Sequence, residues 1–295
     1  MIGIDWGTTS LRAYRLAADG TILGRIEREA GILTIPAGGF PAALEAAIGP
    51  WLAQGESQVL LCGMVGSRQG WVEAPYLPCP AGPAEIAACL TRIPHERAEL
   101  WLVPGLEARD AGGVPDVMRG EETKLIGLLA ALGEAPALAC LPGTHSKWAW
   151  LEGGRISRFA TQMTGEVRAV LLAHSILGRM AGAGPTDAAA FRRGVRRARE
   201  AGGLLHHLFG TRGLGLMGEL SAAETASYLS GLLIGHEIGA VQPAGTVLLA
   251  GAEALTKAYA LAFEEYGLAW RLDDVDLAAR GLHSIAVLRE GSALS

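Results

Sequence analysis

The sequence has few aromatic residues, no excess of positive charge and no clustered cysteines. Aromatic residues make up 6% of the 295 residues, and the formal net charge is −5 at pH 7. An acidic chain offers little basic surface to a polyanion, so we expect no nucleic-acid partner. The four cysteines are far apart and form no Cys-x-x-Cys pair: Cys62, Cys79, Cys89 and Cys140. This pattern argues against a zinc site and against a disulfide framework.

Long uncharged hydrophobic runs are also absent, which predicts no membrane segment. The first strand is expected from residue 2, which leaves no room for a signal peptide, so we expect a cytoplasmic protein without a membrane partner. Glycine is abundant, at 41 residues, and half of the chain is hydrophobic. A chain of this length and composition can build two cores, and we expect an α/β protein with two domains.

The chain opens on a predicted hairpin whose turn has the composition of a phosphate-binding site. An apolar strand over residues 2–6 contains the acid Asp5, and Gly7, Thr8 and Thr9 follow before a second strand begins. Small hydroxyls and backbone N–H groups suit a phosphate, and a carboxylate beside them suits the magnesium that accompanies it. The alternative is a surface hairpin that uses Gly-Thr-Thr only for its geometry.

The same order of residues returns in the middle of the chain. An apolar strand from residue 137 runs into Gly143, Thr144 and His145, and a second strand follows. Both copies then reach a tight hairpin turn, at residues 19–20 and 153–154. Two such turns facing each other could hold one polyphosphate from both sides. Leu141 stands where the first copy has its acid, so a second carboxylate must come from elsewhere.

Glu121 and Glu122 are the candidates for that second carboxylate. They lie in a helix expected over residues 116–132, with Asp116 as its N-cap. Acids near a helix N-terminus often only compensate the helix dipole. Because this helix is expected at the crossing between the domains, one of the two carboxylates could instead bind magnesium through water or accept a proton from a hydroxyl nucleophile.

A polar loop over residues 63–71 follows a short buried strand and contains Ser67, Arg68, Gln69 and Trp71. Strand ends that open into loops are where α/β folds place ligands. We expect Arg68 to bind a carboxylate with two donors, Ser67 and Gln69 to bind hydroxyls, and Trp71 to wall the pocket. The alternative is an irregular connection with Arg68 in a surface ion pair.

Three further patterns give weaker signals. Gly251 ends a predicted strand and opens a helix that includes Glu253, so its N–H groups could approach a nucleotide, although this step is common in α/β proteins. The neighbours His206 and His207 lack the partner spacing of a metal site. The arginines within residues 192–199 are expected on a solvated helix face.

Taken together, these motifs resemble the superfamily of sugar kinases, heat-shock chaperone ATPases and actin, and more specifically the 2-dehydro-3-deoxygalactonokinase family. The segments that carry the resemblance are residues 63–71, 74–76, 118–123, 141–148 and 230–237. The resemblance implies two related ribonuclease H-like (actin-like ATPase) domains, with mixed sheets flanked by helices and an interdomain nucleotide cleft. We expect these domains at 1–115 and 116–295, with the last helix able to pack back on the first.

The same resemblance implies the ATP-dependent phosphorylation of 2-dehydro-3-deoxy-D-galactonate at its 6-hydroxyl in galactonate breakdown, with ATP and Mg²⁺ as cofactors. The family's phosphate motifs fall on Asp5, Gly7, Thr8, Thr9, Gly143, Thr144 and His145, and its adenosine motif falls on Gly251 and Glu253. Asp5, Glu121 and Glu122 are the catalytic candidates, with Mg²⁺ near Asp5 and, through water, Glu121. Which carboxylate is the catalytic base stays open, and so does the oligomeric state. Two alternative functions also stay open: an exopolyphosphatase-like hydrolase and a non-catalytic nucleotide-driven scaffold.

Overall fold

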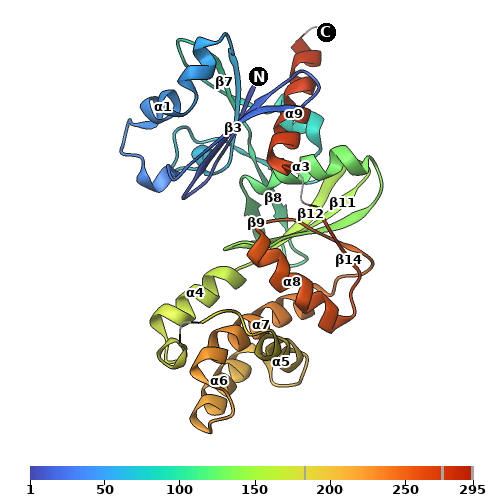
Figure 1. Cartoon of the computed structure of the whole chain (residues 1–295). Coiled ribbons are helices and arrows are strands. Elements are labelled where there is room, and N and C mark those ends of the chain that lie inside the picture. Colours follow the sequence, from blue (N-terminus) through green and yellow to red (C-terminus); the bar gives the residue numbers. More distant parts are fainter. Residues whose placement is uncertain (183, 274–275, 294–295) are drawn as a thin grey trace. The chain divides into compact units, whose positions relative to one another are not determined.

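The computed structural model describes residues 1–182, 184–273 and 276–293, which form two compact units (Figure 1). Unit 1 contains residues 1–136, 149–160 and 276–293, and unit 2 contains residues 137–148 and 161–273. The division into domains at 1–115 and 116–295 stays a prediction, and its residues 183, 274–275 and 294–295 lie outside the described residues. In the structure, residues 116–136 and the last helix belong to the same unit as the first 115 residues.

A six-stranded mixed sheet forms the centre of unit 1, in the order β3-β2-β1-β4-β7-β6. Its strands are β1 (Ile2–Trp6), β2 (Leu11–Leu16), β3 (Ile22–Arg28), β4 (Gln58–Cys62), β6 (Thr91–Ile93) and β7 (Glu99–Leu102). β1 pairs antiparallel with β2, as predicted, and parallel with β4. The loops after β1 and β4 therefore leave the sheet at the same edge.

The helices of unit 1 cover both faces of this sheet. They are α1 (Phe40–Ala53), α2 (Pro83–Ala88), α3 (Glu121–Leu132) and α9 (Leu277–Ala293), with 3₁₀ turns at Ile32–Thr34 and Met64–Gly66. Ile4 and Trp6 of β1 share a core cluster with residues of α1. Gly3 faces the other way, where a Cβ would lie 3.0 Å from the side chain of Leu282 in α9. Asp5 alternates to the same face as Gly3.

α3 begins later than the sequence predicted, because residues 115–118 are extended. They form β9 (Pro115–Met118) in a small sheet with β5 (Tyr76–Pro78) and β8 (Gly105–Arg109). Gly120, with a φ of +104°, separates β9 from the helix, so the prediction of Asp116 as N-cap was wrong. The apolar residue Val117, which fitted the helical pattern, lies in this strand and is 44% exposed.

Unit 2 is organised around a second sheet, in the order β12-β11-β10-β13-β14. Its strands are β10 (Ala137–Leu141), β11 (Ser146–Glu152), β12 (Arg155–Gln162), β13 (Val247–Leu249) and β14 (Trp270–Leu272). Residues 149–160, the outer part of the β11–β12 hairpin, group with unit 1. The hairpin turn is confirmed, since Gly153 and Gly154 have φ values of +56° and +71°.

Helices make up most of the rest of unit 2. They are α4 (Thr164–His174), α5 (Ala188–Ala198), α6 (Gly203–Leu216), α7 (Ala222–Val241) and α8 (Glu253–Tyr266), with a 3₁₀ turn at Gly178–Met180. Ser221 caps α7, and a Cβ on Gly231 of α7 would lie 1.9 Å from the carbonyl oxygen of Phe191 in α5. Only glycine allows these two helices to approach so closely.

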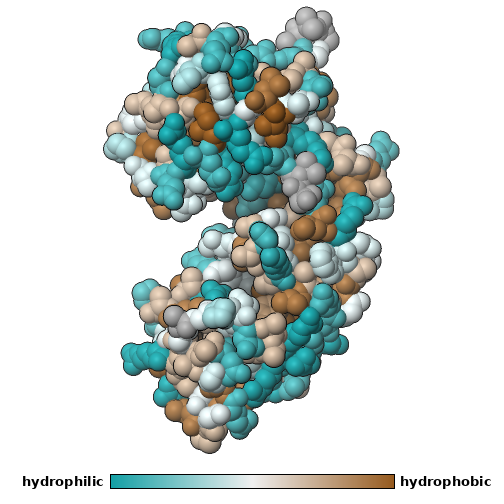
Figure 2. Space-filling view, viewed as in Figure 1, coloured by the Kyte–Doolittle hydropathy of each residue, from teal (hydrophilic) through white to brown (hydrophobic). Residues whose placement is uncertain are grey.

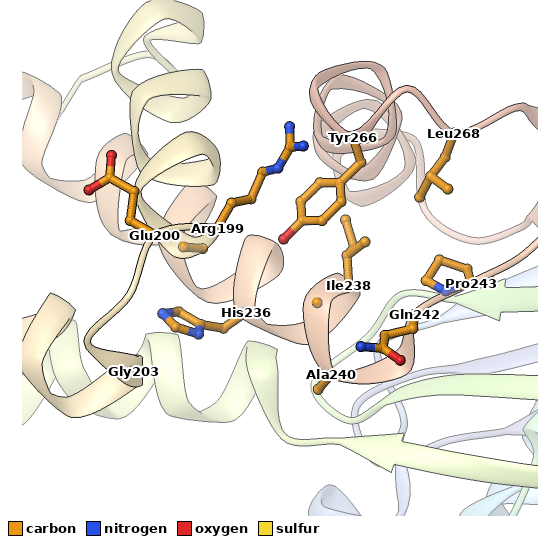
Figure 3. Close-up of a pocket in the computed structure, with 12 residues that line it drawn as sticks. Arg199, Glu200, Gly203, His236, Ile238, Ala240, Gln242, Pro243, Tyr266 and Leu268 are labelled. Atoms are coloured by element: carbon orange, nitrogen blue, oxygen red, sulfur yellow. The ribbon is translucent and has the colours of Figure 1, made fainter.

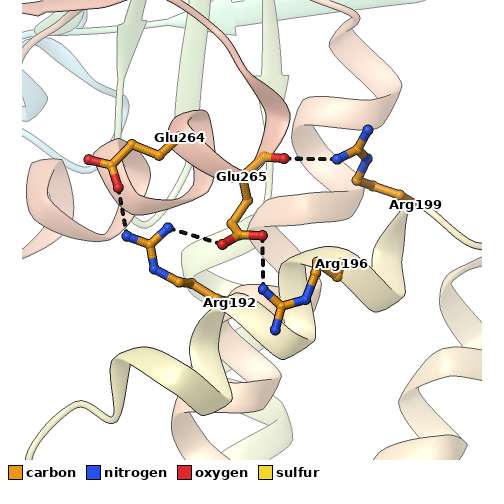
Figure 4. A network of polar contacts seen from close by, with 5 residues as sticks. All are labelled: Arg192, Arg196, Arg199, Glu264 and Glu265. Atoms are coloured by element: carbon orange, nitrogen blue, oxygen red, sulfur yellow. Dashed lines mark hydrogen bonds and ion pairs between the residues drawn. The ribbon is translucent and has the colours of Figure 1, made fainter.

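The arginines of α5 do not simply face solvent. Arg192 binds Glu264 and Glu265 of α8 at 2.6 and 3.0 Å, and Arg196 binds Glu265 at 3.0 Å (Figure 4). The predicted solvated face holds for Arg196, whose side chain is 55% exposed, whereas the Arg192 side chain is only 30% exposed and pairs with two carboxylates. Among the described residues, no helix combines the length and the apolar character needed to cross a membrane.

Candidate functional site

The first predicted phosphate turn lies between β1 and β2 and is supported from behind. The N–H of Gly7 donates to the carbonyl of Ser10 at 2.9 Å, and the Thr8 and Thr9 side chains are exposed. Gly31 packs directly against the turn, where a Cβ would lie 2.2 Å from the carbonyl oxygen of Thr8. The backbone of the turn is thus fixed while its two hydroxyls face solvent.

Asp5 lies beside this turn with 12% of its side chain exposed, and its nearest charge is one that the sequence analysis missed. The ammonium of Lys124, from the first turn of α3, lies 3.7 Å from Asp5 Oδ2. The Asp5 carboxylate raises the pKa of Lys124. The spacing of three residues between Glu121 and Lys124 places both on one side of α3, which is the signal that could have suggested it.

Two glycines bring the three segments of this site together. Gly63 follows β4 with a φ of +94°, and a Cβ there would lie 2.8 Å from the carbonyl oxygen of Trp6 and 3.2 Å from Asp5 Oδ1. Gly120 packs on the other side, where a Cβ would lie 3.1 Å from the Cα of Gly63. Both residues have positive φ, which favours glycine. The start of α3 and the end of β4 can therefore approach Asp5.

The two glutamates of α3 have different environments. Glu122 is fully buried, and its carboxyl accepts the Gly120 N–H at 2.6 Å and the Thr123 hydroxyl at 3.0 Å. Burial, and then the nearby Glu121, raise the pKa of Glu122 to about 8. Glu121 is only partly buried and accepts the Arg119 N–H at 3.2 Å. Glu122 thus holds the start of α3 through buried hydrogen bonds, whereas Glu121 keeps contact with solvent.

The predicted acceptor loop has two residues that solvent reaches freely. Arg68 and Gln69 are exposed, with 87% of the Arg68 side chain accessible and only a 3.6 Å ion pair to Glu73. The Ser67 hydroxyl donates to the carbonyl of Met64 at 2.7 Å, so it is left as an acceptor. Trp71 is partly buried and stacks on the ring of Phe40, with 6.1 Å between ring centroids.

A second arginine, Arg119, lies under this loop and was missed by the sequence analysis. It is 8% exposed, donates from Nη2 to the carbonyl of Ala74 at 2.8 Å and lies over the ring of Tyr76 at 4.3 Å. Neither Nε nor Nη1 has a hydrogen-bond acceptor among the described residues. A buried donor without an acceptor is costly, so this side chain marks a constrained contact between the loop and the start of α3.

The second predicted phosphate turn joins β10 to β11 in unit 2. Thr144 and His145 are exposed, and His145 Nε2 pairs with the carboxylate of Glu166 in α4. The N-terminus of α4 packs tightly on the turn, because a Cβ on Gly165 would lie 2.4 Å from the carbonyl oxygen of Gly143. As in the first turn, the backbone is fixed and the side chains face solvent.

Behind the second turn lies a buried hydrogen-bond network. Tyr259 of α8 donates to Glu237 Oε2 and lies within hydrogen-bonding distance of Ser146 Oγ, at 2.7 Å in each case. The Trp148 indole donates to Glu237 Oε1, also at 2.7 Å. Burial raises the pKa of Glu237. The network connects the strand that leaves the turn to α7 and α8.

Of the two residues of the predicted adenosine motif, only Gly251 lies beside the second turn. A Cβ on Gly251 would lie 3.4 Å from the carbonyl oxygen of Pro142, which immediately precedes the turn. Glu253 is 81% exposed and pairs with Lys257 within α8. The structure thus gathers Asp5, the first turn, the 63–71 loop and α3 in unit 1, and the second turn and Gly251 in unit 2.

A cavity of about 680 Å³ lies elsewhere in unit 2, where α5, α7 and α8 end (Figure 3). None of the predicted site residues lines it. His236 lies at its edge, and burial and the neighbouring His207 lower the pKa of His236. His207 Nδ1 lies 3.0 Å from His236 Nε2, which agrees with a structural role and not with the metal site that adjacent histidines suggest.

The whole chain, including these residues, is similar to known proteins of one family. The model of the 2-keto-3-deoxy-galactonokinase family matches residues 5–285. A relative from Rhizobium meliloti (strain 1021), named a probable 2-dehydro-3-deoxygalactonokinase, is 40% identical over 292 residues, covering 96% of this chain and 95% of its own. A 2-dehydro-3-deoxygalactonokinase from Escherichia coli (strain K12) is 37% identical over 273 residues, covering 90% of both chains.

Two solved structures extend the comparison. The crystal structure of a candidate 2-dehydro-3-deoxygalactonokinase from Sinorhizobium meliloti has a TM-score of 0.89 at 38% identity, covering 99% of this chain and 98% of the other. An activator of 2-hydroxyisocaproyl-CoA dehydratase from Clostridium difficile has a TM-score of 0.51 at 11% identity, covering 100% and 97%. This second likeness concerns the fold alone. The predicted α/β class, with mixed sheets flanked by helices, is confirmed.

Proposed function

This chain belongs to the 2-keto-3-deoxy-galactonokinase family, and we propose that it transfers the terminal phosphoryl group of ATP to the 6-hydroxyl of 2-dehydro-3-deoxy-D-galactonate. The products are ADP and 2-dehydro-3-deoxy-6-phospho-D-galactonate. The enzyme is a carbohydrate kinase and uses ATP. The observation that carries the proposal is the family match from residue 5 to residue 285, with two relatives of that name at 40% and 37% identity. Its use of ATP in sugar-acid breakdown supports a cytoplasmic location.

We assign the ATP phosphates to the two turns, on Gly7, Thr8, Thr9, Gly143, Thr144 and His145. Both turns combine a fixed backbone with exposed side chains, which supports this assignment. A fixed turn loses little conformational entropy when it binds, so its N–H and hydroxyl donors are preorganised. Gly251, beside the second turn, and Glu253 are proposed for the adenosine side.

The residues around Asp5 fit a magnesium ion that retains most of its water ligands. Magnesium takes oxygen ligands and is often held by one or two carboxylates together with substrate phosphates. Asp5 is partly exposed, and Glu121 is a second partly exposed carboxylate in unit 1. No group of three or more metal-binding side chains occurs among the described residues. When bound, Mg²⁺ would neutralise charge on the transferring phosphoryl group.

Lys124 is the third charged group of this cluster. Its ammonium faces Asp5 at 3.7 Å, a distance at which the pair leaves both groups able to take other partners. We propose that Lys124 contributes positive charge near the transferring phosphoryl group, and that Asp5 and Glu121 position the metal and the acceptor hydroxyl. Glu122, buried and hydrogen-bonded to Gly120 and Thr123, holds the start of α3 in place.

We propose the 63–71 loop as the acceptor site. Arg68 has its guanidinium in solvent, where it can bind the carboxylate of the sugar acid with two donors, and Gln69 is exposed beside it. Ser67 can accept a hydrogen bond from a substrate hydroxyl, and Trp71 walls the loop. Arg119 acts as a positioning residue, because it joins Ala74 and Tyr76, which follow the loop, to the start of α3.

The decisive experiment measures ADP release with a panel of acceptors. The panel contains 2-dehydro-3-deoxygalactonate, its gluconate epimer, the corresponding aldonic acids, and a sample without acceptor. The proposal expects strong stimulation by 2-dehydro-3-deoxygalactonate and a phosphate on carbon 6 of the product. Rapid ADP release without an acceptor would instead indicate a hydrolase. Slow ADP release at the same rate with and without acceptors would indicate a scaffold.

A further inference from the structure

α6 carries hydrophobic side chains both on its packed side and on its exposed side. Leu208 points inward and packs against clusters of α7 residues. On the other side, Leu205 is 83% exposed, Phe209 is 65% exposed and Leu216 is 61% exposed. Their spacing of four and seven residues places them on one face of the helix. An exposed apolar helix face of this kind is a candidate contact surface, so the outer face of α6 calls for a partner.

The exposed face is large enough to form most of an interface. Met217, 75% exposed, adds to it just beyond the helix end. At roughly 150–200 Å² for a fully exposed side chain, the four residues present about 500 Å² of apolar surface. The largest such patch on a monomer is typically about 300–600 Å², and each partner of a standard interface contributes about 800 Å². In the view of Figure 2, hydrophobic residues reach the surface at the end of unit 2 where Figure 1 labels α6.

The order of residues along this face is complementary to itself when the helix is reversed. If two copies of α6 lie antiparallel, with a two-fold axis between residues 210 and 211, Leu205 of one copy comes opposite Leu216 of the other. Phe209 then comes opposite Arg212, whose guanidinium can lie on the ring. A Cβ on Gly213, beside Arg212, would have no atom within 4 Å, so this position leaves room for the ring.

The charges on α6 also favour a second copy over a different protein. The helix contains one arginine and no acidic residue, and the aromatic ring that can accept this cation lies on the same face. Closed two-fold contacts of this kind are the commonest way in which identical chains associate. We propose that the chain forms a homodimer through antiparallel packing of α6 on α6. This proposal does not depend on the proposed kinase activity.

The experiment measures the mass of the full chain in solution by sedimentation velocity and by light scattering, over a wide range of concentrations. We expect about twice the 30.7 kDa mass of one chain for the natural sequence. Leu205→Lys and Leu216→Glu, each alone, place a charge against a leucine of the second copy and should give monomers. The double variant places the lysine opposite the glutamate at both ends of the pair and should restore the dimer.

Leu23→Lys is the matched control, because Leu23 of β3 is 61% exposed, as Leu216 is, but lies in unit 1. It should remain dimeric. Since all substituted side chains face solvent, circular dichroism and the unfolding temperature should change little in every variant. A monomeric natural chain at all concentrations would overturn the proposal, and so would dimeric single variants. Single variants that are monomeric together with a double variant that stays monomeric would overturn the antiparallel pairing.

Discussion

Replacing Tyr259 by phenylalanine tests whether the buried network behind the second turn holds it in place. The change removes one hydroxyl, which bonds to Glu237 and Ser146 at 2.7 Å each, and leaves the ring packed on Phe263. A hydrogen bond to a buried carboxyl group contributes about 1.5–3 kcal/mol, because the buried acceptor that loses this donor does not regain a bond to water. We expect Tyr259→Phe to lower the free energy of unfolding by about 2–3 kcal/mol.

Tyr266→Phe, on the same helix, is the matched control. The Tyr266 hydroxyl donates to the neutral carbonyl of Gly235 at 2.7 Å, so its loss should cost only about 1 kcal/mol. Both values come from urea unfolding of the full chain. Because Ser146 begins the strand that leaves the second turn, Tyr259→Phe should also raise the KM for ATP, and Tyr266→Phe should not. Equal losses of stability in the two variants would refute the reasoning.

Glu237→Gln extends this test to pH. Burial raises the pKa of Glu237 above its unfolded value, so the native state binds the proton more tightly. Its contribution to stability is full below the unfolded pKa and is lost as the pH rises towards the folded pKa. Glutamine can still accept the Trp148 N–H and donate to the Tyr259 oxygen, and it does not ionise. The variant should therefore lose less stability than the natural chain between pH 5 and pH 7, and parallel curves would contradict this.

The remaining predictions concern the two turns and the acceptor loop. Asp5→Asn should lower kcat by about 10²-fold or more with every acceptor, since transfer depends on placing charge beside the phosphoryl group; normal turnover would remove Asp5 from the metal site. Arg68→Ala should raise the KM for the sugar acid about tenfold or more, the loss of a charge-assisted pair, and leave the KM for ATP unchanged. Gly165→Ala, whose Cβ would lie 2.4 Å from the carbonyl oxygen of Gly143, should lower the unfolding free energy by about 1–3 kcal/mol. Gly291→Ala, whose added Cβ would have no atom within 4 Å, should not lower the unfolding free energy. An equal loss of stability in the Gly165 and Gly291 variants would contradict the packing argument.

Local patterns predicted the elements that depend on local chemistry. The Gly-Gly turn between β11 and β12 requires positive φ, so it is visible in the sequence. The helix predicted over residues 116–132 failed at its start because Gly120 and the partner strand β8 decide where β9 ends. A periodicity of apolar residues does not report which neighbour a segment will pair with.

The sequence by itself determined where the two turns lie, that they share one order of residues, and to which family the chain belongs. These properties depend on residue types at fixed spacing. Tertiary structure alone decided which of two adjacent glutamates is buried, that Lys124 lies beside Asp5, and that Arg119 lies under the acceptor loop. It also decided that the outer side of α6 is left uncovered within the described residues. Burial and charge pairing depend on distances between segments far apart in the chain, and packing sets those distances.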